Sequence, residues 1–216
     1  ETSCRISPLL VTVGKTVTEG ELLVECVAES ASQNEVSIAT SSSGQRADLE
    51  QLQKRQDLLL DAARSDAIAK RHARGQRTAR ENVADLIDEG TFVEYGGFGV
   101  AAQRSRRSEE DLVANTPADG LITGLATINS ELFGAENTNC AVVAYDYTVL
   151  AGTQGFINHR KKDRIFEVAK RNMTPVVLFA EGGGGRPGDT DAPGVAVLDV
   201  MSFASFAQLS GLVPLV

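Results

Sequence analysis

The sequence has few of the residue types on which many catalytic and structural sites depend. Its 216 residues include two histidines, three cysteines and no tryptophan. So few histidines argue against a histidine-based metal centre and against a histidine-based catalytic triad. The cysteines, Cys4, Cys26 and Cys140, have no CxxC spacing and too few partners for a disulfide framework. We therefore expect no metal site and a reducing compartment of the cytoplasmic type.

An excess of positive charge and long apolar runs are also absent. The net charge is −8, which argues against a general affinity for nucleic acid. No run approaches the roughly 18 apolar residues that suffice to cross a membrane, and the polar start lacks the pattern of a signal peptide. With 42% apolar and 23% charged residues, the composition is ordinary for a soluble globular protein with one large core or one and a half domains.

Residues 1–30 predict short β-strands. β-Branched and polar residues alternate through residues 7–24, with Gly14 and Gly20 as turn positions. This spacing resembles the trailing half of a biotinyl or lipoyl domain. Such domains carry their cofactor on the lysine of a Met-Lys turn, which this sequence lacks, and Lys15 lies in a different local context. The resemblance implies a biotinylated lysine upstream of Glu1, and an unrelated β-hairpin is the alternative.

The next segment predicts a linker and two helices. Residues 31–48 are rich in serine, alanine, glutamine and threonine, which is typical of a linker between domains. An apolar stripe that starts near Asp48 predicts a helix ending at Gly75. A capping box at Thr78-x-x-Glu81 predicts a second helix, which ends at Gly90 before a strand over residues 91–94.

The rest of the chain predicts strands and helices in alternation after a long loop over residues 95–118. Strands are expected over residues 120–128, 140–145, 175–180 and from Val213 onward, and helices over residues 156–172 and 197–210. This succession is typical of an α/β domain with right-handed crossovers.

Two glycine-bearing loops follow two of these strands. One covers residues 151–155, and the other covers residues 181–189 with four consecutive glycines. If the two strands are neighbours, both loops lie at one edge of the sheet. Bare backbone N–H groups without an obvious nucleophile indicate an oxyanion hole rather than covalent catalysis. A flexible surface loop is the alternative for the four glycines.

Other glycine-rich motifs do not fit the second loop. A phosphate-binding P-loop requires Gly-Lys-Ser/Thr, whereas Gly185-Arg186-Pro187 stands here. A dinucleotide fingerprint does not fit because Pro187-Gly188 follows the glycines. The Gly-x-Ser-x-Gly elbow of α/β-hydrolases is also missing.

Two basic clusters have two interpretations each. They are solvated helix faces and ends, or docking surfaces for an anionic cofactor tail. The clusters comprise Lys70, Arg71, Arg74, Arg77 and Arg80, and Arg104, Arg106 and Arg107.

Five segments together resemble one family, the carboxyltransferase subunits of biotin-dependent acyl-CoA carboxylases. The segments keep the order of the family's motifs and place the resemblance over about residues 47–216; they cover residues 70–82, 85–94, 118–120, 146–155 and 181–186. The resemblance implies an α/β, crotonase-like fold of two related halves, of which residues 49–216 form the N-terminal half. With the biotinyl-like start, it also implies a fused multidomain carboxylase.

The resemblance further implies the chemistry. A carboxyl group passes from carboxybiotin to the α-carbon of an acyl-CoA of the acetyl or propionyl type, through an enolate held by backbone amides. The amides implied are those of Gly183 and Gly184, with Gly152 contributing. The positions implied to contact coenzyme A or biotin are Thr153, Gln154, Gly155, Lys161, Gly182, Gly185 and Arg186. A solvated helix lysine is the alternative for Lys161.

The second loop departs from the family's commoner Asp-Ser-Gly-Gly-Ala-Arg. Glu181 and Gly182 replace Asp-Ser, and Gly185 replaces alanine, while the paired glycines remain. We expect the departures to affect the acyl-chain preference and to leave the oxyanion role intact.

The implied partners are acyl-CoA, a biotinyl domain and biotin carboxylase component, the C-terminal half of the carboxyltransferase, and further copies in a homo-oligomer. Because the sequence starts with Glu1 and stops in an apolar run, we expect a fragment that is inactive alone. A decarboxylase of the same fold and a non-catalytic scaffold are the alternative functions.

Overall fold

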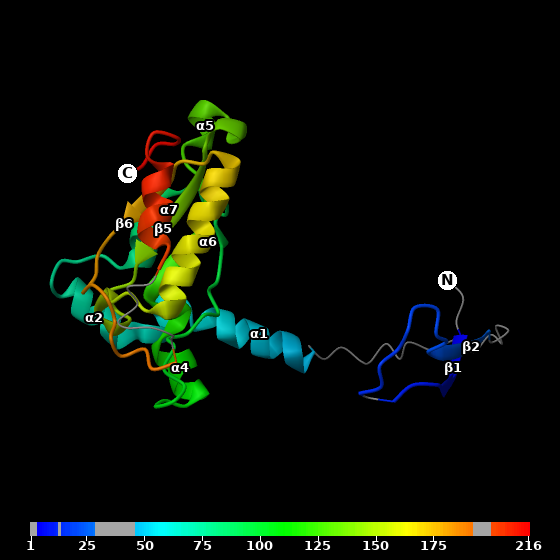
Figure 1. Ribbon diagram of the computed structural model, residues 1–216. Helices are drawn as coiled ribbons and strands as arrows, with labels where there is room; N and C mark the ends of the chain where they lie inside the picture. Colours follow the sequence, from blue (N-terminus) through cyan, green and yellow to red (C-terminus); the bar gives the residue numbers. More distant parts are fainter. Residues whose placement is uncertain (1–3, 13, 29–45, 192–199) are drawn as a thin grey trace. The chain divides into compact units, whose positions relative to one another are not determined.

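The computed structural model describes residues 4–12, 14–28, 46–191 and 200–216 (Figure 1). The chain divides into two compact units, Glu1–Gly44 and Gln45–Val216, and each is described by itself. Most of the predicted linker, residues 31–48, lies outside the described residues.

The first unit contains the predicted short strands. β1 (Cys4–Leu9) pairs antiparallel with β2 (Val24–Ala28), with an irregular register between Ile6 and Leu9. Gly14 and Gly20 have φ angles of +88° and +85°, a conformation that glycine adopts without a steric penalty. Both therefore act as turn residues, as predicted. The likeness of this hairpin to a biotinyl domain stays a prediction.

The second unit is built around a sheet with the strand order β3-β4-β5-β6. β3 and β4 are antiparallel, β4 and β5 are antiparallel, and β5 and β6 are parallel. The strands are β3 (Val93–Glu94), β4 (Leu121–Thr127), β5 (Asn139–Tyr145) and β6 (Val176–Phe179). Two short turns join β4 to β5, namely α5 (Ser130–Phe133) and η3 (Ala135–Asn137). Residues near the end extend the sheet, because Leu215 bridges Val176 in parallel.

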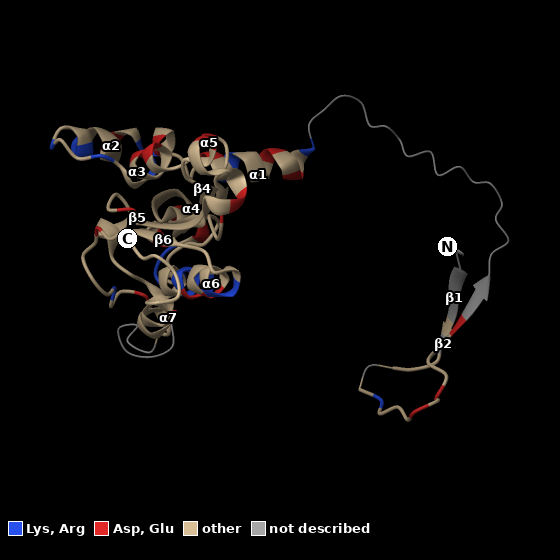
Figure 2. Cartoon of the chain, turned by 90° about the horizontal axis from the view of Figure 1, so that it is seen from above, with Lys and Arg blue, Asp and Glu red and all other residues tan. Residues whose placement is uncertain are grey.

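Helices cover both faces of this sheet (Figure 2). α6 (Phe156–Asn172) matches its predicted range, connects β5 to β6 and packs beside α7 (Ser202–Leu209) on one face. There Ala141 and Val143 of β5 join a buried cluster with Ile165 and Phe166. α3 (Ala79–Leu86) lies on the opposite face, where its residues pack against the alternate β5 side chains Cys140, Val142 and Ala144. The predicted helix over residues 197–210 begins later, and residues 197–199 lie outside the described residues.

The single helix predicted up to Gly75 is wrong. The chain forms α1 (Ala47–Asp57), η1 (Asp61–Arg64) and α2 (Ser65–His72) instead. Leu60 is extended, with a ψ angle of 155°, and the Leu59 carbonyl accepts a hydrogen bond from Arg80. Contacts from α3 therefore hold the chain in a break that the apolar spacing alone did not indicate. Two other parts of the prediction are confirmed. Gly75 has the left-handed conformation expected after a helix, with a φ of +70°, and both hydrogen bonds of the Thr78–Glu81 capping box form.

The loop predicted over residues 95–118 contains a helix, α4 (Glu109–Asn115), and a tight turn, η2 (Pro117–Gly120). The hydroxyl of Ser108 accepts a hydrogen bond from the Asp111 amide at 3.2 Å. Acidic residues at the first three positions of α4 favour this helix start, because the amino end of a helix is partly positive. Among the described helices, none is both long and apolar enough to span a membrane.

Candidate active site

The two glycine loops meet at the carboxyl ends of β5 and β6. The Gln154 amide donates to the Gly184 carbonyl at 2.7 Å, and the Arg186 amide donates to the Gln154 carbonyl at 2.9 Å. A third bond joins the Gly183 amide to the Ala151 carbonyl at 3.0 Å. These bonds make a short parallel bridge between Gln154 and Gly185. The expectation that both loops lie at one sheet edge is confirmed.

The close approach of the loops requires glycine at two positions. A β-carbon on Gly152 would overlap the Glu181 carbonyl oxygen, and one on Gly182 would overlap the Gly152 carbonyl oxygen. Gly152 also has a φ of +62°, which disfavours other residues. The loops therefore pack backbone against backbone at this pair, while Gly182, Gly183 and Gly185 are exposed. The alternative of a surface loop is thus right about the surface, but the loop has fixed contacts with its neighbour.

The three amides predicted to form an oxyanion hole differ in their present partners. The Gly183 amide is bonded to Ala151, and the Gly152 amide donates to the Val149 carbonyl at 3.0 Å. Among the described residues, no hydrogen-bond acceptor is found for the Gly184 amide. A β-carbon on Gly184 would meet nothing within 4 Å, so there is open space beside it. Of the three predicted donors, Gly184 is thus the one whose amide has no acceptor among the described residues.

Arg186 turns its guanidinium into the protein, beneath the loops. It is 5% exposed and forms a buried ion pair with Asp119, which is fully buried. Its Nε donates to the Thr153 hydroxyl at 3.0 Å, and Asp189 lies 3.5 Å from Nη1. Burial raises the pKa of Asp119, and the charge of Arg186 opposes this rise. These contacts hold the second loop, whereas a contact of Arg186 with a cofactor stays a prediction.

Other predicted contact positions also belong to the framework of the loops. Thr153 donates its hydroxyl proton to the Leu150 carbonyl at 2.7 Å and so stiffens the first loop. A β-carbon on Gly155 would overlap Asp189 and Arg186 side-chain atoms. Asp189 in turn accepts a hydrogen bond from the Phe156 amide at 2.8 Å, at the start of α6. The lack of a side chain at Gly155 therefore leaves room for Asp189 and Arg186, whose hydrogen bonds join the loops to the start of α6.

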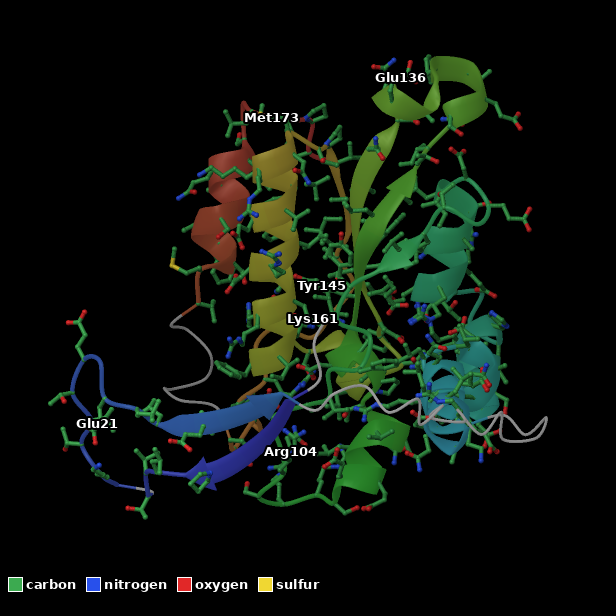
Figure 3. All side chains as sticks on the ribbon, turned by 90° about the vertical axis from the view of Figure 1, so that its right-hand side faces the viewer. Glu21, Arg104, Glu136, Tyr145, Lys161 and Met173 are labelled. Carbon is green, nitrogen blue, oxygen red and sulfur yellow. The ribbon has the colours of Figure 1, made fainter. Side chains whose placement is uncertain are left out.

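Lys161 is a buried residue of α6, and Figure 3 labels it on that helix. Its amine donates to the Ala118 carbonyl at 2.8 Å and to the Leu121 carbonyl. Burial lowers its pKa to about 8. The interpretation as a solvated helix lysine is therefore wrong. Its side chain lines a cavity of about 270 Å³, together with Tyr95, Gly96, Thr123, Ile157, Arg160 and Arg164.

The first basic cluster is not one solvated face. Arg71 is 7% exposed and forms an ion pair with Glu181 at 2.8 Å. Arg80 is partly buried and pairs with Glu94 at 3.0 Å. The Arg71–Glu181 pair gives a physical reason for the departure at position 181, because it ties α2 to the start of the second glycine loop.

The second basic cluster lies beside the loops. Arg107 pairs with Asp111, and Arg106 approaches Gly188. Both arginines line a pocket of about 420 Å³ with Gln103, Leu150, Thr153, Arg186 and Gly188. Because Arg106 and Arg107 line a pocket, this cluster stays a candidate docking surface for an anionic cofactor tail.

Sequence reasoning missed several charged residues around the site. Asp119, Asp189, His159 and Lys162 are all less than one tenth exposed, yet each can ionise. For Asp119 and His159 the reason is distance in the sequence, because Asp119 pairs with Arg186 and His159 bonds Ser202, both more than 40 residues away. Lys162 has nearer partners, Gln154 and Tyr145, but they lie in a loop and a strand outside its helix. Only the meeting of the two loops brings these groups together.

The fold and the site define an α/β domain in which two glycine loops are joined at the carboxyl ends of neighbouring parallel strands. Residues 70–214 match the family model described as the carboxyl transferase domain, and the chain belongs to this family. The family predicted from the five sequence segments is confirmed.

Curated relatives are carboxyltransferase subunits. The chain is 31% identical over 169 residues to the propionyl-CoA carboxylase beta chain of Saccharopolyspora erythraea, which covers 77% of this chain and 28% of the relative. It is 28% identical over 184 residues to the methylmalonyl-CoA carboxyltransferase 12S subunit of Propionibacterium freudenreichii, and this match covers 85% of this chain and 32% of the relative. The chain thus spans less than a third of the length of these relatives.

Solved structures give the same picture. A single-chain, multi-domain long-chain acyl-CoA carboxylase matches 98% of this chain with a TM-score of 0.74 and 54% identity, over 19% of its own length. Transcarboxylase 12S, solved with methylmalonyl-CoA bound, matches 77% of this chain and 29% of its own, with a TM-score of 0.55 and 27% identity. The predicted α/β, crotonase-like fold of carboxyltransferases is confirmed.

Proposed function

We propose that this chain forms the acyl-CoA-binding half of a biotin-dependent carboxyltransferase, which adds a carboxyl group to the α-carbon of an acyl-CoA. The observation that best supports the proposal is the bridge between Gln154 and Gly185, which holds the two glycine loops together at the sheet edge of a carboxyl transferase domain. The relatives do not favour the alternatives of a decarboxylase or a non-catalytic scaffold.

The chemistry of this half is the polarisation of the thioester. Removal of the α-proton gives an enolate, and its oxygen requires hydrogen-bond donors that are already in place. One such donor is worth roughly 2.7–4 kcal/mol in comparable sites. The Gly184 amide is our first candidate, and the amides of Gly183 and Gly152 join it only if they release their present carbonyl partners. Carboxybiotin, when brought to the site, would supply the carboxyl group and would be left as biotin.

The acyl chain is the finer part of the proposal. Relatives named for propionyl-CoA are about 30% identical to this chain, whereas the long-chain acyl-CoA carboxylase is 54% identical. This difference supports an acyl chain longer than the acetyl or propionyl group expected from the motifs. The predicted contacts of Lys161, Thr153, Gln154, Gly155, Gly182, Gly185 and Arg186 with coenzyme A or biotin belong to the same proposal.

The predicted partners are the remaining part of the proposal. The match to a single-chain, multi-domain carboxylase covers nearly the whole chain, which supports a fused biotinyl domain preceding residues 31–48 and a biotin carboxylase component in one polypeptide. The 12S transcarboxylase is a hexamer, which supports a homo-oligomer. A cytoplasmic location is the expectation that accompanies this enzyme class.

The test uses the full-length protein with acetyl-, propionyl- and long-chain acyl-CoA. In Gly184→Ala, a φ of +85° strains the new side chain and moves the amide, so we expect kcat to fall by about 10²–10³. Gly211→Ala is the matched control, because Gly211 has a φ of +80°, the same open surroundings and a position outside the loops. Full activity in Gly184→Ala, with equal loss of Tm in both variants, would overturn the amide assignment.

A further inference from the structure

A second polar cluster lies beside the loops, and the chemistry above assigns no role to two of its three members, Lys162 and Tyr145. Lys162 of α6 is 3% exposed, and its amine donates to the Gln154 side-chain oxygen and, at 3.2 Å, to the Tyr145 hydroxyl. The Tyr145 hydroxyl also donates to the Gln154 oxygen at 3.2 Å. The amine lies 5.1 Å from the centre of the Tyr145 ring. Lys162, Tyr145 and Gln154 thus form one closed cluster.

This cluster contacts both glycine loops. Gln154 belongs to the first loop, and its backbone forms two of the three hydrogen bonds that join the loops. Tyr145 lies under the second loop, because a β-carbon on Gly182 would be 3.1 Å from its ring. The side chains of the cluster therefore fix the same residue whose backbone sets the separation of the loops.

Burial of the Lys162 amine is unfavourable for its charged form. Burial lowers the pKa of Lys162 to about 8, which shows that its surroundings disfavour the charge. Its two hydrogen-bond partners are neutral, and no carboxylate forms an ion pair with it among the described residues. An apolar side chain would pack there without this penalty. The geometry of the amine points to Gln154, whose side-chain oxygen it shares with the Tyr145 hydroxyl.

We propose that Lys162 is a positioning residue, which fixes Gln154 with the help of Tyr145 and so holds the two glycine loops at the separation that presents the Gly184 amide. This inference rests on the proposed function for its effect on catalysis, but not for its effect on the loops. Loss of the amine frees the Gln154 side chain, loosens both of its backbone bonds and lets the loops separate.

The test measures the loops and the reaction separately in full-length protein. In Lys162→Met we expect amide exchange at Gln154 and Arg186 to accelerate about tenfold or more, since these amides form the bridge. We expect kcat to fall by about 10–100-fold with the KM for acyl-CoA within about twofold, because misplaced donors act on the transition state. Lys170→Met is the control, since Lys170 is exposed on the same helix and bonds Gln208.

Tyr145→Phe keeps the ring under Gly182 and removes one hydroxyl, so it remains informative if Lys162→Met fails to fold. We expect a smaller change of the same kind, with exchange at Gln154 faster by about threefold. Unchanged exchange in both variants overturns the positioning role, even if activity falls. Faster exchange in a protein whose wild type shows no carboxyl transfer supports the positioning role and overturns only the proposed function.

Discussion

A β-carbon on Gly182 would overlap the carbonyl oxygen of Gly152, so the two glycine loops touch through their backbones at this pair. This contact sets how closely the loops approach, independently of any side chain they carry. The cluster of Lys162, Tyr145 and Gln154 acts on the same approach. The separation of the loops therefore depends on both the backbone contact and the side-chain cluster.

Gly182→Ala should separate the loops, because the new β-carbon would overlap the backbone carbonyl of Gly152, which cannot move aside as a flexible side chain could. We expect kcat/KM of the full-length enzyme to fall by about 10² or more, as for other small misplacements of catalytic groups. Gly75→Ala is the control, since Gly75 has a φ of +70° and no atom near its β-position, so only backbone strain acts there. Equal activity in both variants would contradict the contact.

The buried pair of Asp119 and Arg186 should respond strongly to the loss of one partner. Asp119→Ala leaves the guanidinium of Arg186 in a buried site with less compensation, and we expect the free energy of unfolding to fall by about 3–5 kcal/mol. Replacing both residues by apolar ones should cost clearly less than the sum of the single changes. Denaturant unfolding of the four proteins checks this, and additive losses would refute the coupling.

His159 should make stability depend on pH in mildly acidic solution. Burial, with the charges of Lys162 and Arg186, lowers its pKa from 6.5 to about 4. Between these values the unfolded chain binds the proton first, so stability is complete above pH 6.5 and falls as the pH drops toward 4. The slope due to this residue is about 1.4 kcal/mol per pH unit. His159→Gln should lose this part of the slope, and an unaltered pH profile would contradict the assignment.

The Arg71–Glu181 pair should matter for both activity and stability. Glu181 is partly exposed and regains water when Arg71→Met removes its partner, but Arg71 is buried and also donates two hydrogen bonds to the Arg77 carbonyl, so stability falls as well. The start of the second loop also loses its tie to α2, and we expect kcat to fall by about tenfold. Arg77→Met is the control, because the Arg77–Asp85 pair is exposed and far from the loops in sequence. Equal kinetics in both variants would show that the tie is unimportant.

Local signals in the sequence were sufficient for much of the fold. The Thr78–Glu81 capping box and α6 formed as predicted, because their patterns act through neighbouring turns of one helix. The position of both glycine loops also followed from strand order, since parallel strands end at the same sheet edge.

Long-range contacts determined what the sequence could not predict. The break at Leu60 depends on Arg80 binding the Leu59 carbonyl, and the burial of Lys161 depends on carbonyls 40 residues or more away. The partners already held by the Gly152 and Gly183 amides follow from the fold of the loops themselves. None of these contacts has a signature in spacing or composition.

The bridge between Val176 and Leu215 has a consequence for synthesis. The backbone of Val176 bonds to residues 214 and 216, which leave the ribosome almost forty residues after β6 itself. Until then β5 is the one partner of β6 among the described strands, and the other edge of β6 is an unpaired apolar strand of the kind that promotes aggregation. A pause in translation before residue 214 would prolong the time during which nascent chains can associate through this edge.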